Sequence, residues 1–375
     1  METKSHRHRA WCQFVPPYVI DELVKVDQED IRVAAQVTSH QATADRASRV
    51  VRERSRHHLA GSVKVDERRP DTPGEAAREV FDCRNQWEKR VRIARREDAP
   101  PTGDIDVDSA YNVAGAALQY LKNEFNRNSV DDWGMNLGLN VHFGVDYMNA
   151  FWDGEEVVFG DGDGEIFVGF ARSPDVIAHE LGHGITQYTA NLRYFGQAGA
   201  LNEHFSDVLG TVVTQFHSGE TVRTADWLIG DEIMGPALRG QALRSMRAPG
   251  TAYDNPLMGT DPQPAHMDNY YDGLADNQGV HINSGIPNRA FYLVATELDD
   301  TFTAGRLWYR ALQRLRPSAS FVDAAEILVD TAQLMTGEGK LPTGSDEIVT
   351  AAFSEVGILK VDVPPRRSTR HRPPL

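Results

Sequence analysis

The chain has 375 residues, of which 41% are apolar and 25% are charged, and its formal net charge is −15. This composition is typical of a globular protein with sizeable cores, and the negative charge argues against a nucleic-acid partner. No apolar run approaches the length of a transmembrane helix, so a membrane partner is not expected either.

Two cysteines, Cys12 and Cys83, are too few for a disulfide framework. The basic residues at the N-terminus are not followed by an apolar stretch, which predicts that a standard signal peptide is absent. Two locations therefore remain possible for the protein: the cytoplasm, or the outside of the cell after export by a non-classical route.

Residues 1–58 are predicted to form a separate unit. A short apolar patch, broken by Pro16 and Pro17, precedes an Arg-rich and helix-compatible stretch over residues 39–59. Charge runs of this kind usually form a solvated helix. An alternative interpretation is an interaction module built on this basic helix, with the rest of the chain as its scaffold.

Residues 59–190 are predicted to be rich in strands. Strands and hairpins are expected between residues 59 and 96, and further strands at 140–145 and 156–160, with 149–154 as the turn between them. A helix is predicted over residues 108–125, capped by Asp108 or Ser109. The Gly-Asp repeat at 160–164 lacks the spacing and the closing Glu of an EF-hand, so we interpret it as a structural turn.

The stretch from His179 to His183 reads His-Glu-Leu-Gly-His. Positions four apart on a helix lie on one face, so both imidazoles can reach one ion and Glu180 can reach a water on it. Zn²⁺ in catalytic sites takes three protein ligands and keeps a fourth position for water. Five-residue patterns also recur by chance, so this motif alone does not decide between zinc and a surface helix.

A second pair supplies a candidate third ligand. Glu203 and Asp207 are four apart on a predicted helix, which places both carboxylates on one face. Glu203 would complete a zinc site, and Asp207 would hold a zinc-binding imidazole from behind. Two histidines, a carboxylate, an adjacent base and a supporting acid together indicate a hydrolytic zinc site.

The second half of the chain is predicted to be mostly helical. Helical spacing of apolar residues covers residues 202–216, 282–298, 304–315, 319–335 and 346–356, with a long polar loop at 247–273 and a disordered tail at 361–375. The fold class is therefore α+β, with a β-rich lobe at 59–190 that includes the zinc-binding helix and a helical lobe at 191–360. The zinc is expected at the floor of a cleft between them.

These motifs, in this order, resemble the thermolysin family of neutral zinc metalloendopeptidases. The matching segments between about residues 104 and 359 are Asn149–Trp152 with the loop at 159–164, His179–His183, Gly199–Asp207, Leu243–Met246 and Asp276–Gly285. The resemblance implies a thermolysin-like two-lobe metalloprotease. Its zinc ligands would be His179, His183 and Glu203, its base Glu180, and its supporting residues Asp207 and Asn202.

The resemblance also implies roles for residues that are ambiguous by themselves. His281, oriented by Asp276, and Tyr194 would stabilise the oxyanion, although a lone His or Tyr is more often an ordinary polar or buried residue. Three further residues would hold the peptide main chain of a substrate: Asn149, Ala150 and Arg244.

Six positions that correspond to the family's pocket beyond the scissile bond are all apolar: Phe167, Phe170, Val176, Ile229, Ile233 and Leu243. The pocket should therefore prefer a bulky apolar residue at P1′, the residue that carries the leaving amine. The preference should be broad, because each apolar side chain contributes only a few kcal/mol. The alternative is that these residues simply belong to the core.

Relatives of the protealysin type begin with a similar Pro-Pro patch, often preceded by a Cys. Residues 1–58 would then be an inhibitory prosegment, and the chain's own prosegment would be its partner. Cys12 keeps two interpretations. It is either a thiolate that blocks the open zinc position until cleavage near residues 50–60, or a small buried residue that packs the prosegment onto the body.

Calcium is the point at which the sequence departs from the family. Asp175, Asp226 and Asp231 keep matching positions, but Thr214 and Leu228 stand where acids are expected. A double calcium site is therefore not expected, and one weak site near Asp175 stays open.

The predicted function is a zinc-dependent endopeptidase that is made as a precursor and acts on peptides and proteins as a monomer. The rival is a zinc-stabilised binding protein without activity. Such a protein would be expected to lose Glu180 or His281, and both are present.

Overall fold

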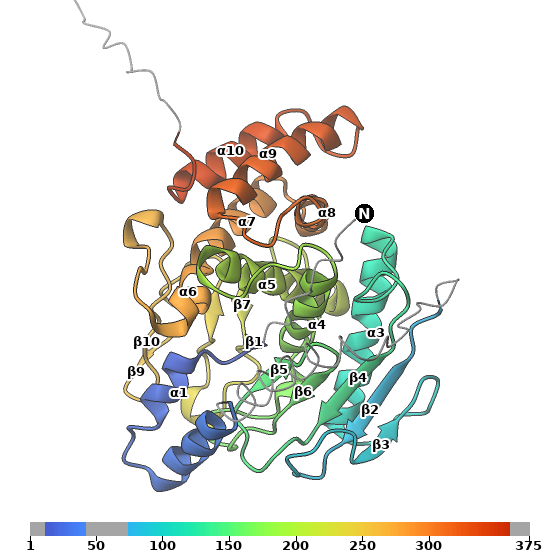
Figure 1. The fold of residues 1–375 in the computed structure, drawn as a ribbon, viewed down its shortest axis with the longest axis vertical. Helices are drawn as coiled ribbons and strands as arrows, with labels where there is room; N and C mark the ends of the chain where they lie inside the picture. Colours follow the sequence, from blue (N-terminus) through green and yellow to red (C-terminus); the bar gives the residue numbers. More distant parts are fainter. Residues whose placement is uncertain (1–11, 43–73, 361–375) are drawn as a thin grey trace, which may run out of the picture.

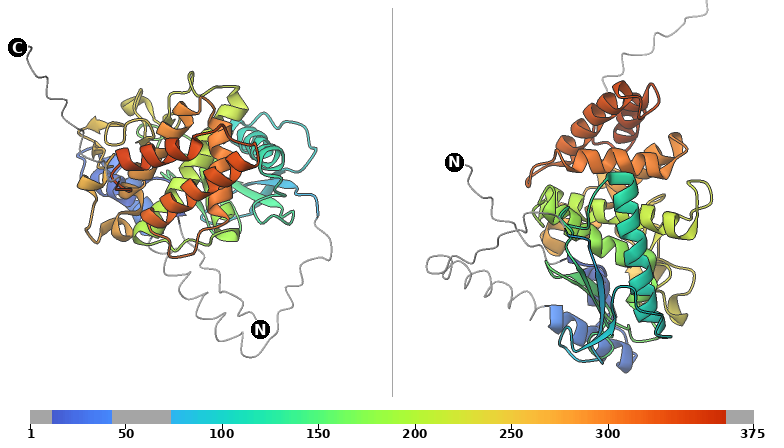
Figure 2. Two further views of the ribbon diagram at one scale, coloured as in Figure 1. Left: turned by 90° about the horizontal axis from the view of Figure 1, so that it is seen from above. Right: turned by 90° about the vertical axis from the view of Figure 1, so that its right-hand side faces the viewer.

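The computed structural model describes residues 12–42 and 74–360, and its elements form two lobes (Figure 1). A sheet lies in one lobe and the C-terminal helices lie at the opposite end of the molecule from α1 (Figures 1 and 2). This arrangement confirms the predicted α+β class. The predictions for residues 43–59, for a boundary at residue 58 and for the tail at 361–375 lie outside the described residues.

Six strands form the main sheet in the order β1-β5-β6-β4-β2-β3. The pairs β2–β4 and β4–β6 are parallel and the other pairs are antiparallel. The strands are β1 (Cys12–Gln13), β2 (Arg78–Asp82), β3 (Arg92–Arg95), β4 (Leu137–Val141), β5 (Ala150–Trp152) and β6 (Val157–Phe159). Because β1 pairs only with β5, the N-terminal segment forms one edge of this sheet.

Two predictions about the strands were wrong in ways that affect the site. Residues 149–154 were expected to form a turn, but β5 occupies residues 150–152, and the turn follows it. There Asp153 accepts the backbone N–H groups of Glu155 and Glu156 at 2.9 Å. The strand predicted at 140–145 is β4, which ends earlier because His142 adopts a left-handed φ of 54°.

Helix α3 (Ile105–Phe125) packs against the sheet and begins three residues before the predicted start. Its cap is Asp104, whose side chain accepts from the backbone of residues 106 and 107. The predicted cap, Asp108, instead accepts the N–H groups of Thr102 and Gly103 and pairs with Arg95.

Helices α4 (Pro174–Tyr188) and α5 (Gly196–Ser218) cross in the middle of the molecule and are buried over most of their length. A Cβ atom on Gly182 would lie 2.8 Å from the Cα atom of Ser206. Only glycine therefore permits this approach, which brings the histidines of α4 up to the carboxylates of α5.

The helical lobe continues with α6 (Ala275–Asn283), α7 (Gly285–Glu297), α8 (Thr301–Leu312), α9 (Phe321–Gly337) and α10 (Ser345–Glu355). The helix predicted at 282–298 is α7, but it begins three residues later than predicted, because the chain breaks between α6 and α7 at Ser284. Pro287 lies in the first turn of α7, where its missing N–H has no helical partner to lose. None of the helices in residues 12–42 and 74–360 is long and apolar enough to cross a membrane.

The N-terminal segment is part of the same packed body. Helix α1 (Pro17–Leu23) starts at the second proline of the Pro-Pro pair, and residues 29–42 are helical. Phe14 and Val15 are fully buried and belong to one apolar cluster with residues of both lobes. The segment therefore crosses the region where α4, α5 and β5 meet.

Candidate active site

Helix α4 presents His179 and His183 to the same point. The Nδ1 atom of His179 lies 2.8 Å from the Asp207 carboxylate, and that of His183 lies 2.9 Å from the Asn202 side-chain oxygen. These acceptors hold the proton on Nδ1, so each Nε2 keeps its lone pair. The two Nε2 atoms then lie 3.5 and 3.6 Å from the Glu203 carboxylate on α5.

The chemistry of this cluster fits a zinc ion. The Nε2 atoms of His179 and His183 and one carboxylate oxygen of Glu203 are buried and find no hydrogen-bond partner among the described residues. Buried polar atoms are rarely left in this state without an ion or a water. Two neutral imidazoles and one carboxylate are also a donor set that Zn²⁺ takes in hydrolytic enzymes.

Glu180 faces the same region from the next position of α4. Both its carboxylate oxygens are buried without a hydrogen-bond partner in the described chain. Burial raises the pKa of Glu180 to about 8. A carboxyl group with a pKa near neutrality can both accept and return a proton.

His281, Asp276 and Tyr194 line the other side of the cluster. Asp276 accepts from the Nδ1 atom of His281 at 2.6 Å and from its backbone N–H at 2.8 Å. Burial opposes the charged imidazole, but the carboxylates of Asp276 and Glu203 outweigh it and raise the pKa of His281 to about 9. The Tyr194 hydroxyl donates to Glu203 and lies 3.2 Å from the Nε2 atom of His281.

A rare backbone conformation orients Asp276. Residues 276–279 all adopt left-handed values, with φ between 50° and 74°. This turn at the start of α6 points the Asp276 carboxylate back at His281, two residues beyond the turn. No secondary structure was predicted for residues 276–279, so this turn was not identified from the sequence.

Arg244 reaches the site from β8 (Arg244–Ser245), which pairs with β7 (Leu228–Ile229). It is fully buried and its guanidinium forms three hydrogen bonds to Asp207, between 2.9 and 3.2 Å. A fourth bond, of 3.1 Å, runs to the carbonyl oxygen of Phe14. The arginine thus joins the residue behind His179 to the N-terminal segment.

Residues 13–15 are bound along β5 through their main chain. The Phe14 N–H donates to the Ala150 carbonyl at 3.0 Å, and Asn149 binds both the N–H and the carbonyl of Val15 at 2.8 and 3.1 Å. The Nε2 atom of His281 lies 2.9 Å from the Gln13 carbonyl oxygen. The sequence interpretation did not identify residues 13–15 as occupants of the site.

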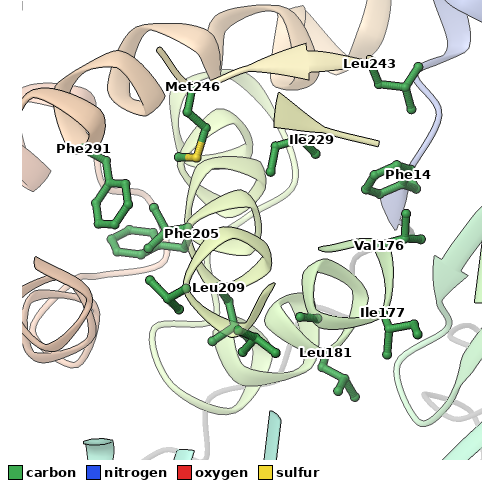
Figure 3. Close-up of a cluster of buried hydrophobic side chains, with 14 of the residues drawn as sticks. Phe14, Val176, Ile177, Leu181, Phe205, Leu209, Ile229, Leu243, Met246 and Phe291 are labelled. Atoms are coloured by element: carbon green, nitrogen blue, oxygen red, sulfur yellow. The ribbon is translucent and has the colours of Figure 1, made fainter. Parts of the chain in front are cut away.

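The Phe14 side chain lies among the residues predicted to form the P1′ pocket. Figure 3 shows it beside Leu243 and Val176, with Ile229 close by. A Cβ atom on Gly230 would lie 3.1 Å from the Phe14 ring, so glycine makes room for it. All six predicted pocket residues are buried in the same cluster as Phe14: Phe167, Phe170, Val176, Ile229, Ile233 and Leu243. A Phe two positions after Cys12, matched to an apolar pocket, was the signal that could have placed the segment.

Cys12 is buried at the His-His-Glu cluster. Its Sγ atom, a ring nitrogen of His183 and a carboxylate oxygen of Glu203 all lie within 4.8 Å of one another. The geometry therefore allows the thiolate interpretation of Cys12.

The residues considered for calcium already have protein partners or crowd each other. The buried Asp175 carboxylate accepts from the Ser173 hydroxyl and from the N–H groups of Val176 and Gly230. Asp226 accepts from the N–H of Leu228. Burial, with the nearby carboxylates of Asp175 and Asp226, raises the pKa of Asp231 to about 7.

Comparison with known proteins gives a consistent result. The model of the thermolysin metallopeptidase catalytic domain matches residues 33–187, and that of its alpha-helical domain matches residues 190–358. An extracellular metalloprotease of Pectobacterium carotovorum is 44% identical over 82% of this chain and 85% of its own length. Protease PrtS of a Photorhabdus strain is 37% identical over 88% of each chain.

Among solved structures, the precursor of protealysin, a metalloproteinase from Serratia proteamaculans, superposes with a TM-score of 0.80. It is 39% identical, and the match covers 93% of this chain and all of that one.

A buried His-His-Glu cluster with an adjacent glutamate, placed between a sheet lobe and a helical lobe, defines a metalloendopeptidase. The chain belongs to the thermolysin metallopeptidase family.

Proposed function

We propose that this protein hydrolyses internal peptide bonds with Zn²⁺ held by His179, His183 and Glu203. The observation that carries the proposal is the convergence of three buried ligand atoms, two imidazole nitrogens and one carboxylate oxygen, beside the Glu180 carboxylate; none of these atoms has a hydrogen-bond partner within the described residues. When bound, the ion supplies a Lewis acid that polarises a carbonyl and acidifies a water. Membership of a metallopeptidase family supports the same reaction.

The protein's own residues do the remaining work. Glu180 accepts the proton of the attacking water and delivers it to the departing amine, as its pKa of about 8 allows. His281 and Tyr194 donate to the oxygen that becomes negative, and Asp276 keeps the imidazole charged and oriented. Asp207 and Asn202 hold the two ligand imidazoles.

The substrate peptide is proposed to lie antiparallel to β5. Asn149 and Ala150 would bind its main chain, and Arg244 the carbonyl of its P1′ residue. The apolar side chains around Phe14 support a preference for bulky apolar residues at P1′. Each contributes a few kcal/mol at most, so several such residues should be accepted.

The N-terminal segment is proposed to keep the precursor inactive. Residues 13–15 hold the substrate-binding groups, and Cys12 is proposed as a ligand that fills the open zinc position, since thiolate is a strong zinc donor. The Pectobacterium relative is described as extracellular, which supports action outside the cell. Fractionation of cells that express the chain decides between that location and the cytoplasm. One weak calcium site near Asp175 stays part of the proposal, and metal analysis tests it.

The test compares wild type with Glu180→Gln on casein and on a short reporter peptide. The amide cannot accept a proton, so the variant should bind zinc at one equivalent and lose about 10²–10⁴-fold in rate. A chelator should abolish the wild-type activity, and added Zn²⁺ should restore it. A Glu180→Gln protein that hydrolyses peptides within severalfold of the wild-type rate would contradict the assignment of the base.

A further inference from the structure

The register of residues 12–15 identifies one particular peptide bond in the site. The Gln13 carbonyl faces His281 at 2.9 Å, and Tyr194 lies 3.2 Å from the same imidazole nitrogen. Gln13 is therefore the residue whose carbonyl oxygen meets the groups that stabilise an oxyanion. In the notation used for substrates, it occupies P1.

The residues that follow occupy the leaving-group side in order. The Phe14 side chain fills the apolar pocket, its N–H binds Ala150 and its carbonyl binds Arg244. The main chain of Val15 is held on both sides by Asn149. Phe14 thus occupies P1′ and Val15 occupies P2′.

The direction of the chain follows from the same contacts. The side chain in the pocket comes immediately after the carbonyl that faces His281. In a segment that ran the opposite way, the residue in the pocket would precede that carbonyl, and Arg244 and Asn149 would meet different main-chain groups. The segment is therefore bound in the orientation of a substrate.

We propose that the Gln13–Phe14 peptide bond is a cleavage site for the chain's own active site, and that Cys12 keeps this bond intact in the precursor. The proposal rests on the proposed hydrolytic function. Hydrolysis adds one water across the bond. The oxygen joins the Gln13 carbonyl carbon, the C–N bond breaks, and Glu180 transfers a proton to the Phe14 nitrogen. The products are the Gln13 carboxylate and a Phe14 amine.

Cys12 protects the bond by position. It directly precedes Gln13, and its Sγ atom lies with His183 and Glu203, in the space that the attacking water needs. A thiolate bound to zinc there leaves no site for that water. Replacing the thiol with a group that does not bind zinc should turn the bound inhibitor into a bound substrate.

The cut should leave most of the segment in place. Among the described residues, the N-terminal product would keep Cys12 and Gln13, which are held by the pairing of β1 with β5 and by the contact of the Gln13 carbonyl with His281. The C-terminal product would keep Phe14, Val15 and α1, which belong to the main apolar cluster. The N-terminal fragment should therefore dissociate before Phe14 leaves the P1′ pocket.

The experiment uses the full-length chain and intact-mass spectrometry. The Cys12→Ala precursor, loaded with zinc, should lose residues 1–13 and gain Phe14 as its new N-terminus. Cys12→Ser serves as a second variant of nearly unchanged size. The Cys12→Ala/Glu180→Gln double variant should keep the bond, and Cys12→Ala/Phe14→Gly should cut it at least 10-fold more slowly, because its P1′ side chain is missing.

A second readout needs no turnover. In full-length Glu180→Gln protein, the Phe14 and Val15 amides should exchange slowly with deuterium, because Ala150 and Asn149 bind them. The Phe14→Ala change in that background should remove the protection. Rapid exchange at both amides in the Glu180→Gln protein would overturn the substrate-like register.

A control separates this proposal from the function on which it rests. The same Cys12→Ala preparation is assayed on casein. If casein is hydrolysed and the Gln13–Phe14 bond stays intact, the self-cleavage proposal is overturned and the proposed function stands. If neither is hydrolysed, both fail.

Discussion

Asp207 is the residue at which most polar contacts of the site meet. It binds the Nδ1 atom of His179, accepts three hydrogen bonds from two nitrogens of Arg244 and, at 2.9 Å, accepts from the side-chain amide of Asn288. Burial alone would raise the pKa of this carboxyl. Arg244 and His179 outweigh that effect and lower the pKa to about 2. Asp207 therefore stays ionised and keeps the imidazole of His179 in one orientation.

The contacts continue from Asp207 into the helical lobe. Trp308 donates to the Nε2 atom of His204 at 2.7 Å, and the Nδ1 atom of His204 lies 2.7 Å from the side-chain oxygen of Asn288. Burial lowers the pKa of His204 to about 4, so this imidazole is neutral and has one donor and one acceptor. The chain Trp308–His204–Asn288–Asp207 is thus fully paired.

Removing Glu203 should remove the metal. Two imidazoles alone form an incomplete zinc site, so dialysed Glu203→Ala protein should hold much less than one equivalent of zinc. Elemental analysis measures this. The matched control is Glu347→Ala on the exposed side of α10, which should keep one equivalent. Full occupancy in the Glu203→Ala protein would mean that another residue is the third ligand.

Removing His204 should destabilise the fold without touching a proposed ligand. His204→Phe keeps an aromatic ring but leaves the Trp308 N–H and the Asn288 oxygen buried without partners. Each such group costs about 1–3 kcal/mol, so the free energy of unfolding should fall by roughly 2–6 kcal/mol. Denaturant titration in a Glu180→Gln background, which prevents self-digestion, measures it. The exposed His217→Phe is the control, and equal effects of the two changes would contradict the role of the paired chain.

At the scale of residues, the sequence predicted contacts between side chains that lie close together in the chain. His179 and His183 share a face of one helix, so their spacing indicated that both imidazoles could reach one ion, and Glu203 made a zinc site the favoured interpretation. His204 could not be interpreted, because its partners Asn288 and Trp308 lie 84 and 104 residues away in sequence. A single sequence does not contain that pairing.

At the scale of elements, the left-handed turn at the start of α6 is a strained structure beside the site. Non-glycine residues in this conformation cost about 1–2 kcal/mol each, and residues 276–278 all adopt it. Their positions are held by Asp276, whose second oxygen accepts the N–H groups of His281 and Ile282. The turn therefore lowers the stability of the fold, but it positions the Asp276 carboxylate against His281.

Replacing Gln278 by glycine should stabilise the protein. Gln278 has a φ of 64°, which glycine adopts without strain, so the change should relieve the strain in the folded protein. Glycine also makes the unfolded chain more flexible, and this offsets part of the gain in stability. We expect a net increase of about 0.5–1 kcal/mol in the free energy of unfolding. The control is Gln278→Ala, which keeps a Cβ atom and should not stabilise. A Gly variant no more stable than the Ala variant would show that the turn is not strained at this position.

His142 joins two elements through its charge. Its ring nitrogens lie 2.8 Å from Asp161 in the Gly-Asp loop and 3.1 Å from Asp104, the cap of α3. The hydrogen bond with Asp161, supported by Asp104 and opposed by burial, raises the pKa of His142 from 6.5 to about 9. The protonated imidazole therefore bridges the loop and the helix at neutral pH.

This bridge predicts a pH-dependent contribution to stability. Below pH 6.5 the imidazole is protonated in both the folded and the unfolded chain, so the bridge contributes its full stabilisation to the fold. This stabilisation declines above pH 6.5, where the unfolded chain loses the proton, and it is lost as the pH passes about 9, the pKa in the folded protein. His142→Asn, which tolerates the left-handed φ, should therefore destabilise at pH 6 and have little effect at pH 9.5. The difference should be about 1 kcal/mol, since both carboxylates are partly exposed to solvent. If the free energies of unfolding of the wild-type and His142→Asn proteins differed by the same amount at both pH values, the proposed bridge would be contradicted.

The predictions of secondary structure failed where contacts with distant segments determine whether a strand forms. The type and order of most helices were predicted because their apolar spacing is regular. Residues 149–154 were interpreted as a turn because three buried residues, Ala150–Trp152, are too short a run to indicate a strand. They form one because β6 and β1 supply partners on both sides. The strand that binds the N-terminal segment was thus the part of the sheet least visible in the sequence.

At the scale of the whole molecule, the N-terminal segment is built into the core. Phe14, Val15, Val19 and Leu23 share one apolar cluster with residues of both lobes. Pro16 and Pro17, which the sequence presented as a rigid break, turn the chain from β1 into the first turn of α1. The sequence indicated a prosegment by resemblance, but the depth of its packing depends on the pocket of the folded body.

The two cysteines differ in environment. Cys83 is buried with Phe143, Tyr147, Phe151 and Val158, and burial raises its pKa to about 12. Such a thiol packs as a small apolar side chain and stays protonated. Cys12 is also buried, but its Sγ atom lies beside His183 and Glu203, two of the proposed zinc ligands. Cys83 is therefore a natural control for the chemistry of Cys12.

A thiol-specific reagent should distinguish a zinc-bound Cys12 from one that merely packs. If Cys12 blocks the zinc, an organomercurial should give the wild-type precursor measurable activity on a reporter peptide, because it removes the thiolate from the ion. The Cys83→Ala precursor should respond as wild type does. The Cys12→Ala precursor should show activity without the reagent and gain nothing from it. If instead Cys12 only packs, Cys12→Ala stays as silent as untreated wild type, and that result would exclude Cys12 as the inhibitory ligand.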